Sequence, residues 1–164
     1  MDILWEELTS GLQDWRQLAH LLARLIAAML LGGVVGIQRE RAGKPAGLRT
    51  HMLVTMGTAV FVMGCAGVGM SLDGLSRVIQ GIITGIGFIG AGSILKLSEE
   101  RDIQGLTTAA GVWMTAAIGV AVGLGSLGVA VLSTLFTLVI LSFARRIERQ
   151  IDERRAAEVD AKDN

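Results

Sequence analysis

The 164-residue sequence contains one cysteine and one proline. A single cysteine excludes an internal disulfide, and Cys65 lies in an apolar run, where we interpret it as a small core residue. The sequence also lacks HExxH, paired CxxC, P-loop and nucleophile-elbow motifs, and His20 and His51 stand apart from other ligand residues. These absences argue against an enzyme and predict neither a metal site nor a bound cofactor. The acidic start, MDILWEEL, is unlike a cleavable signal peptide.

Charge is missing from three long runs: residues 50–71 apart from His51 when protonated, residues 78–95 and residues 103–144. About 20 apolar residues are enough to cross the hydrocarbon layer of a bilayer, so each run is long enough to span it. Hydrophobic residues make up 51% of the chain. The formal net charge of zero conceals a segregation of charges into the N-terminal segment, two loops near residues 40 and 100, and the tail. The composition therefore predicts a membrane protein.

The runs predict an all-α integral membrane fold with about five transmembrane helices. We expect a transmembrane domain at 18–144 with spans near 18–37, 51–70, 75–95, 105–122 and 126–144. The last two spans share 42 uncharged residues, too many for one helix, and the segment GLGSLG at 123–128 divides them. Residues 1–17 place apolar and acidic side chains on opposite faces, which predicts an amphipathic interfacial helix. Residues 145–164 form a charged tail.

Basic residues favour one orientation of these spans. With the C-terminus inside, 12 of the 15 lysines and arginines face the cytoplasm, and only Arg16, Arg24 and Arg77 lie outside. Cytoplasmic loops are typically rich in lysine and arginine. The sequence therefore predicts an N-out, C-in protein of a bacterial inner membrane, with the lipid bilayer as its surroundings and no nucleic acid partner.

Glycine is abundant in the expected spans, most of all in the stretch Gly81 to Leu95. Residues 85–90 match the dinucleotide pattern GxGxxG, but that pattern requires a preceding soluble strand, so we interpret the glycines as helix-packing residues. The spans contain more pairs of glycines four residues apart than the packing of one small bundle needs. These extra pairs predict a homodimer or higher oligomer. The predicted packing positions are Gly32, Gly36, Gly81, Gly85, Gly87, Gly90, Gly92, Gly119 and Gly123.

Polar residues near the ends of the spans are the candidate functional positions, because ionisable groups in a membrane are costly unless they are paired. Arg24 either snorkels to the interface or pairs with an acid inside the bundle. Asp73 and Arg77 have the spacing of an i,i+4 pair, either functional or simply solvated. The full set is Arg24, Glu40, Arg49, Thr50, Asp73, Arg77 and Thr107.

The fourth span allows two interpretations. Gln104, Thr107, Thr108, Trp113 and Thr115 could form a polar lining on a helix of otherwise small residues. Alternatively, the threonines bond to backbone carbonyls within a tightly packed bundle. Spacing alone does not choose between the two.

Three segments, at 38–61, 75–96 and 103–125, resemble the MgtC/SapB family of membrane proteins, in the order and spacing of that family. The resemblance covers roughly residues 20–143. It implies a bacterial inner-membrane protein linked to growth in low magnesium, survival of intracellular pathogens and acid tolerance. Some members resemble modulators of the membrane ATP synthase, and others have been assigned as magnesium transporters.

The family's motifs fall on specific positions of this chain. The acid-arginine-acid motif falls on Gln38, Arg39 and Glu40, so one of its two carboxylates is missing here. The glycine-leucine-arginine-threonine motif falls on 47–50, the aspartate-proline turn on 73–74, the central glycine motif on 85–92 and the GLTTAA segment on 105–110. Longer members carry a soluble domain after the last span, and we expect this chain to be a short member without that domain.

Together these observations predict a non-enzymatic protein that acts through helix association, with itself and with another inner-membrane complex such as the ATP synthase, in adaptation to magnesium limitation or acid stress. A small transporter or channel for Mg²⁺ or protons is the alternative. Such a path normally offers several carboxylates or carbonyls, and the expected spans contain almost no acids. An intramembrane enzyme lacks a convincing general base.

Overall fold

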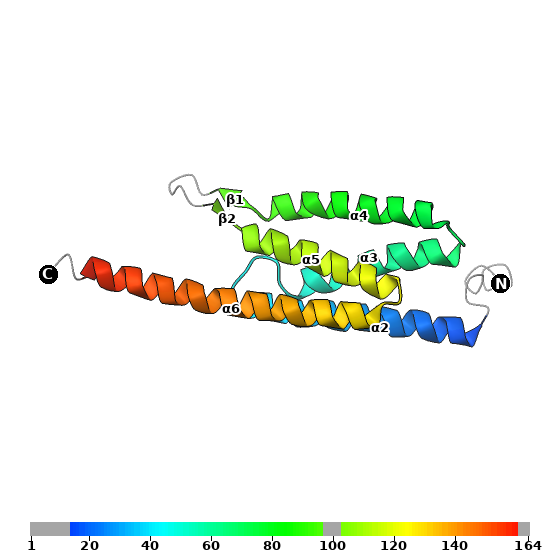
Figure 1. Cartoon of the computed structure of the whole chain (residues 1–164), viewed down its shortest axis with the longest axis horizontal. Coiled ribbons are helices and arrows are strands. Elements are labelled where there is room, and N and C mark those ends of the chain that lie inside the picture. Colours follow the sequence, from blue (N-terminus) through cyan, green and yellow to red (C-terminus); the bar gives the residue numbers. More distant parts are fainter. Residues whose placement is uncertain (1–13, 97–102, 161–164) are drawn as a thin grey trace, which may run out of the picture.

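The computed structural model describes residues 14–96 and 103–160. Within this part of the chain five helices run back and forth side by side (Figure 1). A two-residue antiparallel strand pair, Leu95 with Gln104 and Lys96 with Ile103, lies between the third and fourth of them. The elements are α2 (Trp15–Arg41), α3 (Leu48–Gly67), α4 (Leu72–Gly92), β1 (Leu95–Lys96), β2 (Ile103–Gln104), α5 (Leu106–Gly123) and α6 (Leu127–Asp160).

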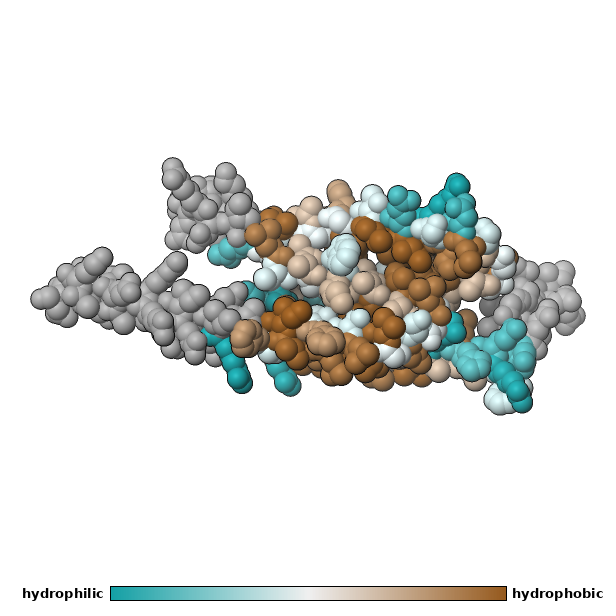
Figure 2. Space-filling model, viewed as in Figure 1, coloured by the Kyte–Doolittle hydropathy of each residue, from teal (hydrophilic) through white to brown (hydrophobic). Residues whose placement is uncertain are grey.

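The predicted all-α membrane fold is confirmed. Helices α2, α3, α4 and α5 are each long and apolar enough to cross a bilayer, and α6 contains a shorter apolar stretch, Leu127–Phe143. Hydrophobic side chains cover the middle of the visible face, and hydrophilic ones gather toward its two ends (Figure 2). This is the surface expected of a protein that has lipid as its solvent.

The helix bounds differ from the predicted spans at the ends. Helix α2 starts three residues before the expected span and continues four residues beyond it, to Arg41. Asp14 caps this helix by accepting a hydrogen bond from the Arg16 N–H at 3.1 Å. The predicted interfacial helix at 1–17 lies mostly outside the described residues. Helix α6 continues without a break from the last span into the charged segment, as far as Asp160.

Helix α3 lies against α2 through a face of glycines. A Cβ atom at Gly32 would overlap the Thr55 side chain and lie 2.6 Å from the His51 carbonyl oxygen. At Gly36 a Cβ would lie 2.6 Å from the Leu48 Cα. Since real Cβ atoms do not approach other atoms so closely, only glycine allows α2 to come this near the α3 backbone.

The other side of α3 receives α5 in the same way. A Cβ at Gly119 would overlap the Thr58 hydroxyl and the Thr55 carbonyl oxygen, and one at Gly123 would lie 2.7 Å from the Val62 Cβ. The glycine pairs on α2 and α5 are therefore used within the chain, with α3 between them.

Helix α4 lies at the edge of the bundle and packs mainly on α5. Its contact there includes Gly90, where a Cβ would lie 3.5 Å from the Ala109 Cβ. The stretch Gly81 to Leu95 contains four more glycines, which were predicted to pack against other helices. Within a single chain these four do not make such contacts. Among the described residues, no atom beyond the chain neighbours and the local helix backbone lies within 4 Å of a Cβ placed at Gly81, Gly85, Gly87 or Gly92.

Replacing Gly119 by alanine should lower the free energy of unfolding by about 1–3 kcal/mol, the usual cost of overpacking, because the new methyl group meets the α3 backbone. The matched control is Gly64→Ala on α3, where a Cβ meets nothing within 4 Å and stability should stay the same or rise. Thermal unfolding followed by circular dichroism in mild detergent measures both. Equal behaviour of the two variants would contradict the assigned packing.

Candidate functional site

A buried polar cluster lies where the ends of three helices meet. Arg39, near the end of α2, is 3% exposed and donates a hydrogen bond from Nη2 to the Thr108 hydroxyl of α5 at 2.9 Å. His51 of α3 is fully buried. Gly111 of α5 lies beside both side chains: a Cβ there would lie 3.8 Å from His51 Nε2 and 3.9 Å from Arg39 Nε. Three helices thus contribute one polar group each to the same region.

His51 is held by one of its two ring nitrogens. Its Nδ1 lies 2.9 Å from the Gly47 carbonyl oxygen, which can only accept, so Nδ1 carries the proton of this bond. Its Nε2 is buried and has no hydrogen-bond partner among the described residues, and the same holds for Gln38 Oε1. Both buried atoms therefore remain available to a further partner.

A hollow of about 430 Å³ opens at the same end of the molecule. Among the described residues, its lining contains one cationic side chain, Lys44, and no carboxylate, and it reaches the buried Thr108. The lining residues are Gly43, Lys44, Pro45, Ser93, Gln104, Gly105, Leu106, Thr107 and Thr108.

Glu40 joins α2 to α3. Its Oε2 accepts a hydrogen bond from the Leu48 N–H at 2.9 Å, at the first residue of α3. The preceding residue, Gly47, provides no side-chain cap, and a Cβ there would lie 2.9 Å from Glu40 Oε2. A carboxylate at a helix N-terminus satisfies a free N–H and matches the helix dipole. The acid and the glycine therefore act together as a joint between the two helices.

Arg24 occupies the opposite end of the bundle. Its Nη1 donates to the Gly123 carbonyl oxygen at 3.1 Å, at the last residue of α5. The chain turns there through Gly125, whose φ of +79° favours glycine, and a Cβ at that position would lie 2.6 Å from Arg24 Nη2. A cation at a helix C-terminus is favourable because the last carbonyls lack intrahelical donors. Arg24 thus binds a helix end, and not one of the described acids.

The other predicted positions do not converge on the cluster. Asp73 and Arg77 form the expected i,i+4 pair at 3.0 Å, with side chains 75% and 77% exposed, which fits the solvated interpretation. Arg49 and Thr107 are exposed, and Thr50 is half-buried. Among the polar residues of α5, the buried side chains are those of Thr108 and Thr115.

Thr115 donates to the Gly111 carbonyl oxygen at 2.8 Å. Trp113, Gln104 and Thr107, by contrast, are exposed. The α5 threonines therefore do not form a continuous polar lining.

Sequence reasoning missed the cluster because it considered Arg39 as a loop residue and His51 as an isolated one. Helical register contains the signal that was overlooked. Arg39 follows Gly32 and Gly36 at spacings of seven and three, on the glycine face of α2 that meets α3. Thr108 likewise precedes Gly111 and Gly119 on the inward face of α5.

The chain matches the MgtC family model over residues 25–150. The chain belongs to the MgtC family. It is also 43% identical to protein SrpB of Synechococcus elongatus over 148 residues, which are 83% of this chain and 79% of SrpB. No solved structure matches it.

Other relatives in the family carry names that refer to magnesium. YhiD of Escherichia coli K12, named as a candidate magnesium transporter, is 45% identical over 131 residues, 75% of this chain and 60% of YhiD. Protein MgtC of Brucella abortus is 39% identical over 138 residues, 84% of this chain and 57% of that protein. The chain therefore spans less than two thirds of the length of these two relatives.

Replacing Thr108 by valine should lower the free energy of unfolding by about 1–3 kcal/mol, because a buried guanidinium loses an acceptor. Thr107→Val is the matched control on the neighbouring, exposed residue and should change stability by less than about 0.5 kcal/mol. Denaturant unfolding in detergent compares the two. A similar loss in both variants, or none in either, would show that the cluster does not stabilise the bundle.

Proposed function

We propose that this MgtC-family chain is a non-enzymatic protein of the bacterial inner membrane that acts by helix association. It associates with a second copy of itself and with another membrane complex, for which the ATP synthase is the first candidate, during adaptation to magnesium limitation or acid stress. The stress role and the candidate complex rest on family resemblance. The association surface rests on the exposed face of α4.

Gln80 is the observation that carries the proposal. It lies eight residues into α4, about 12 Å from the start of the helix, and its side chain is exposed. None of the described residues forms a hydrogen bond with its side-chain amide. A polar amide that faces hydrocarbon at this depth is costly, and a second helix can satisfy it.

Small residues follow Gln80 along the same face of α4. Thr84, Gly87 and Ala91 follow it at helical spacing, and all three are exposed. The Thr84 hydroxyl donates a hydrogen bond to the Gln80 carbonyl oxygen at 3.0 Å. The Gln80 side chain is therefore the polar group of this face that has no hydrogen bond among the described residues. We call the face formed by Gln80, Thr84, Gly87 and Ala91 the outer face of α4. Small residues beside one glutamine fit the close approach of a second helix.

The orientation proposed from the basic residues agrees with the path of the chain. The loops after α2 and α4 and the end of α6 lie toward one end of the molecule (Figure 1). Of the 12 basic residues expected in the cytoplasm, the ten that the structure describes lie in or next to these segments. We therefore assign this end, which includes the Arg39 cluster, to the cytoplasmic side.

Magnesium or proton transport is the competing function, and the name of YhiD favours it. A hydrated Mg²⁺ ion requires several oxygen ligands. Among the described residues no group of three or more His, Cys, Asp or Glu side chains could hold a metal ion. Mg²⁺ entry into vesicles that contain the purified protein, abolished by Glu40→Ala or Asp73→Ala, would favour transport over association.

Replacing Gln80 by leucine should weaken self-association about fivefold, because an interhelical hydrogen bond in a membrane contributes about 1 kcal/mol. Energy transfer between donor-labelled and acceptor-labelled copies in lipid vesicles measures the association. Gln104→Leu, which changes an exposed glutamine outside the helices, should have no effect. Unchanged transfer in both Gln80→Leu and Gly87→Leu would rule out the outer face of α4 as the contact.

A further inference from the structure

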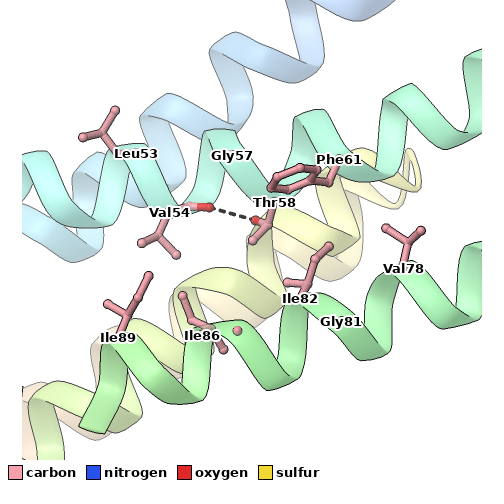
Figure 3. A pocket seen from close by; sticks show the side chains of 11 residues that line it. Leu53, Val54, Gly57, Thr58, Phe61, Val78, Gly81, Ile82, Ile86 and Ile89 are labelled. Carbon is pink, nitrogen blue, oxygen red and sulfur yellow. Dashed lines mark hydrogen bonds between the residues drawn. The ribbon is translucent and has the colours of Figure 1, made fainter. Parts of the chain in front are cut away.

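A second surface of α4 faces α3 across a groove of about 630 Å³. Val54, Ile82 and Ile89 point into the space between the two helices (Figure 3). The groove is wide because three of its positions are glycines, Gly57 on α3 and Gly81 and Gly85 on α4. A Cβ at any of them would meet no other described residue within 4 Å. This lining is separate from the outer face of α4 and contains none of its residues.

The polar groups available along the groove are few. Thr58 has the one polar side chain among the described residues of the lining, and its hydroxyl donates to the Val54 carbonyl oxygen at 2.9 Å (Figure 3). The lining therefore offers apolar surface to its occupant and no free hydrogen-bonding side chain. Large exposed side chains, including Leu53 at 70% and Phe61 at 64% exposure, stand along the α3 side.

The two ends of the groove differ in charge. Beyond the Val78 end lies Arg77, whose charge is matched by Asp73 at 3.0 Å. Beyond the Leu53 end lies Arg49, four residues earlier on the same face of α3, with no ion pair or hydrogen bond among the described residues. The nearby acid Glu40 accepts a hydrogen bond from the Leu48 N–H through its Oε2. Among the described residues, Arg49 is thus the one cation at the ends of the groove without an ion pair, and it lies at one end.

We propose that the groove between α3 and α4 binds an acyl chain of an anionic phospholipid whose phosphate pairs with Arg49. From Arg49 to Phe61 is 12 residues, or about 18 Å along α3, close to the roughly 15 Å depth of one leaflet. Side chains of a helix lean toward its N-terminus, so the Arg49 guanidinium extends toward the membrane surface, at the level of headgroups. Basic residues at the membrane surface attract anionic lipids.

A helix of a second copy is the other possible occupant, and it fits less well. A transmembrane helix would lie along the whole 20-residue length of α3, whereas the groove covers only its middle, from Leu53 to Phe61. It would also leave the Arg49 charge uncompensated unless it supplied an acid at that level. A lipid supplies the apolar chain and the anion in one molecule.

Native mass spectrometry can test this after the full chain is released from nanodiscs of equal parts phosphatidylglycerol and phosphatidylcholine with identical acyl chains. The wild-type chain should retain one lipid per copy, with phosphatidylglycerol enriched over phosphatidylcholine. Arg49→Gln should lower that enrichment about fivefold, the usual effect of one basic residue at an anionic surface, while Arg49→Lys should keep it. Gly85→Leu, which fills the groove, should reduce retention of both lipids.

Arg77→Gln is the matched control at the opposite end of the groove and should retain lipid as the wild type does. Equal enrichment in the wild type and Arg49→Gln would overturn the proposal, and so would unchanged retention in Gly85→Leu. Protection of the groove by a second copy, seen as efficient disulfide cross-linking through Gly57→Cys or Gly85→Cys, would also overturn it. Because a monomer that retains phosphatidylglycerol would still support lipid binding, the result is distinguishable from failure of self-association.

Discussion

The rest of the structure depends on the close approach of two helix backbones to α3. Glycines of α2 and α5 contact α3 from two directions, at distances that no other residue permits. In a bilayer the hydrophobic effect does not hold helices together, so van der Waals contact and interhelical hydrogen bonds must do so. This three-helix unit fixes where the polar side chains can lie, and it leaves α4 attached mainly through α5.

The molecule has two kinds of helix surface, one buried inside the unit of α2, α3 and α5 and one exposed on α4. Inside the three-helix unit, charged residues connect neighbouring helices through hydrogen bonds. Arg39 donates to Thr108, Glu40 caps the start of α3, and Arg24 donates to the last carbonyl of α5. On α4, by contrast, Gln80, Thr84 and Ala91 are exposed, and Gly81, Gly85 and Gly87 contact no other helix among the described residues. A protein that works by contact with lipid and other helices would use the second kind of surface, and α4 supplies it on two separate faces.

The sequence predicted the fold class and the approximate spans because length and absence of charge are enough to identify membrane helices. It also predicted that the glycines at 32, 36, 119 and 123 pack helices, since a spacing of four residues places each pair on one face of its own helix. What it could not predict is which neighbour each face meets. Gly81 and Gly85 have the same spacing as Gly32 and Gly36, yet α4 lies at the edge of the bundle and these glycines line a groove.

The candidate site was predictable in part. Glu40 and Arg24 were predicted as functional positions because charged groups in a membrane are costly unless they are paired. Their partners are backbone groups at helix ends, which cannot be predicted from a pattern of residues. Thr107 was selected in place of Thr108 because a shift of one residue rotates a helix by about 100°, and only the packed register of α5 decides which threonine points inward.

The central claim is that α4 presents one face to a second copy and another to lipid. Disulfide cross-linking of single-cysteine variants along α4, in native membranes and with Cys65 replaced by serine, tests it most directly. The account predicts cross-linked dimers for cysteine at 80, 84, 87 and 91, and little cross-linking at 78, 81, 85 and 89. Efficient cross-linking at the second set, or none at either, would contradict it.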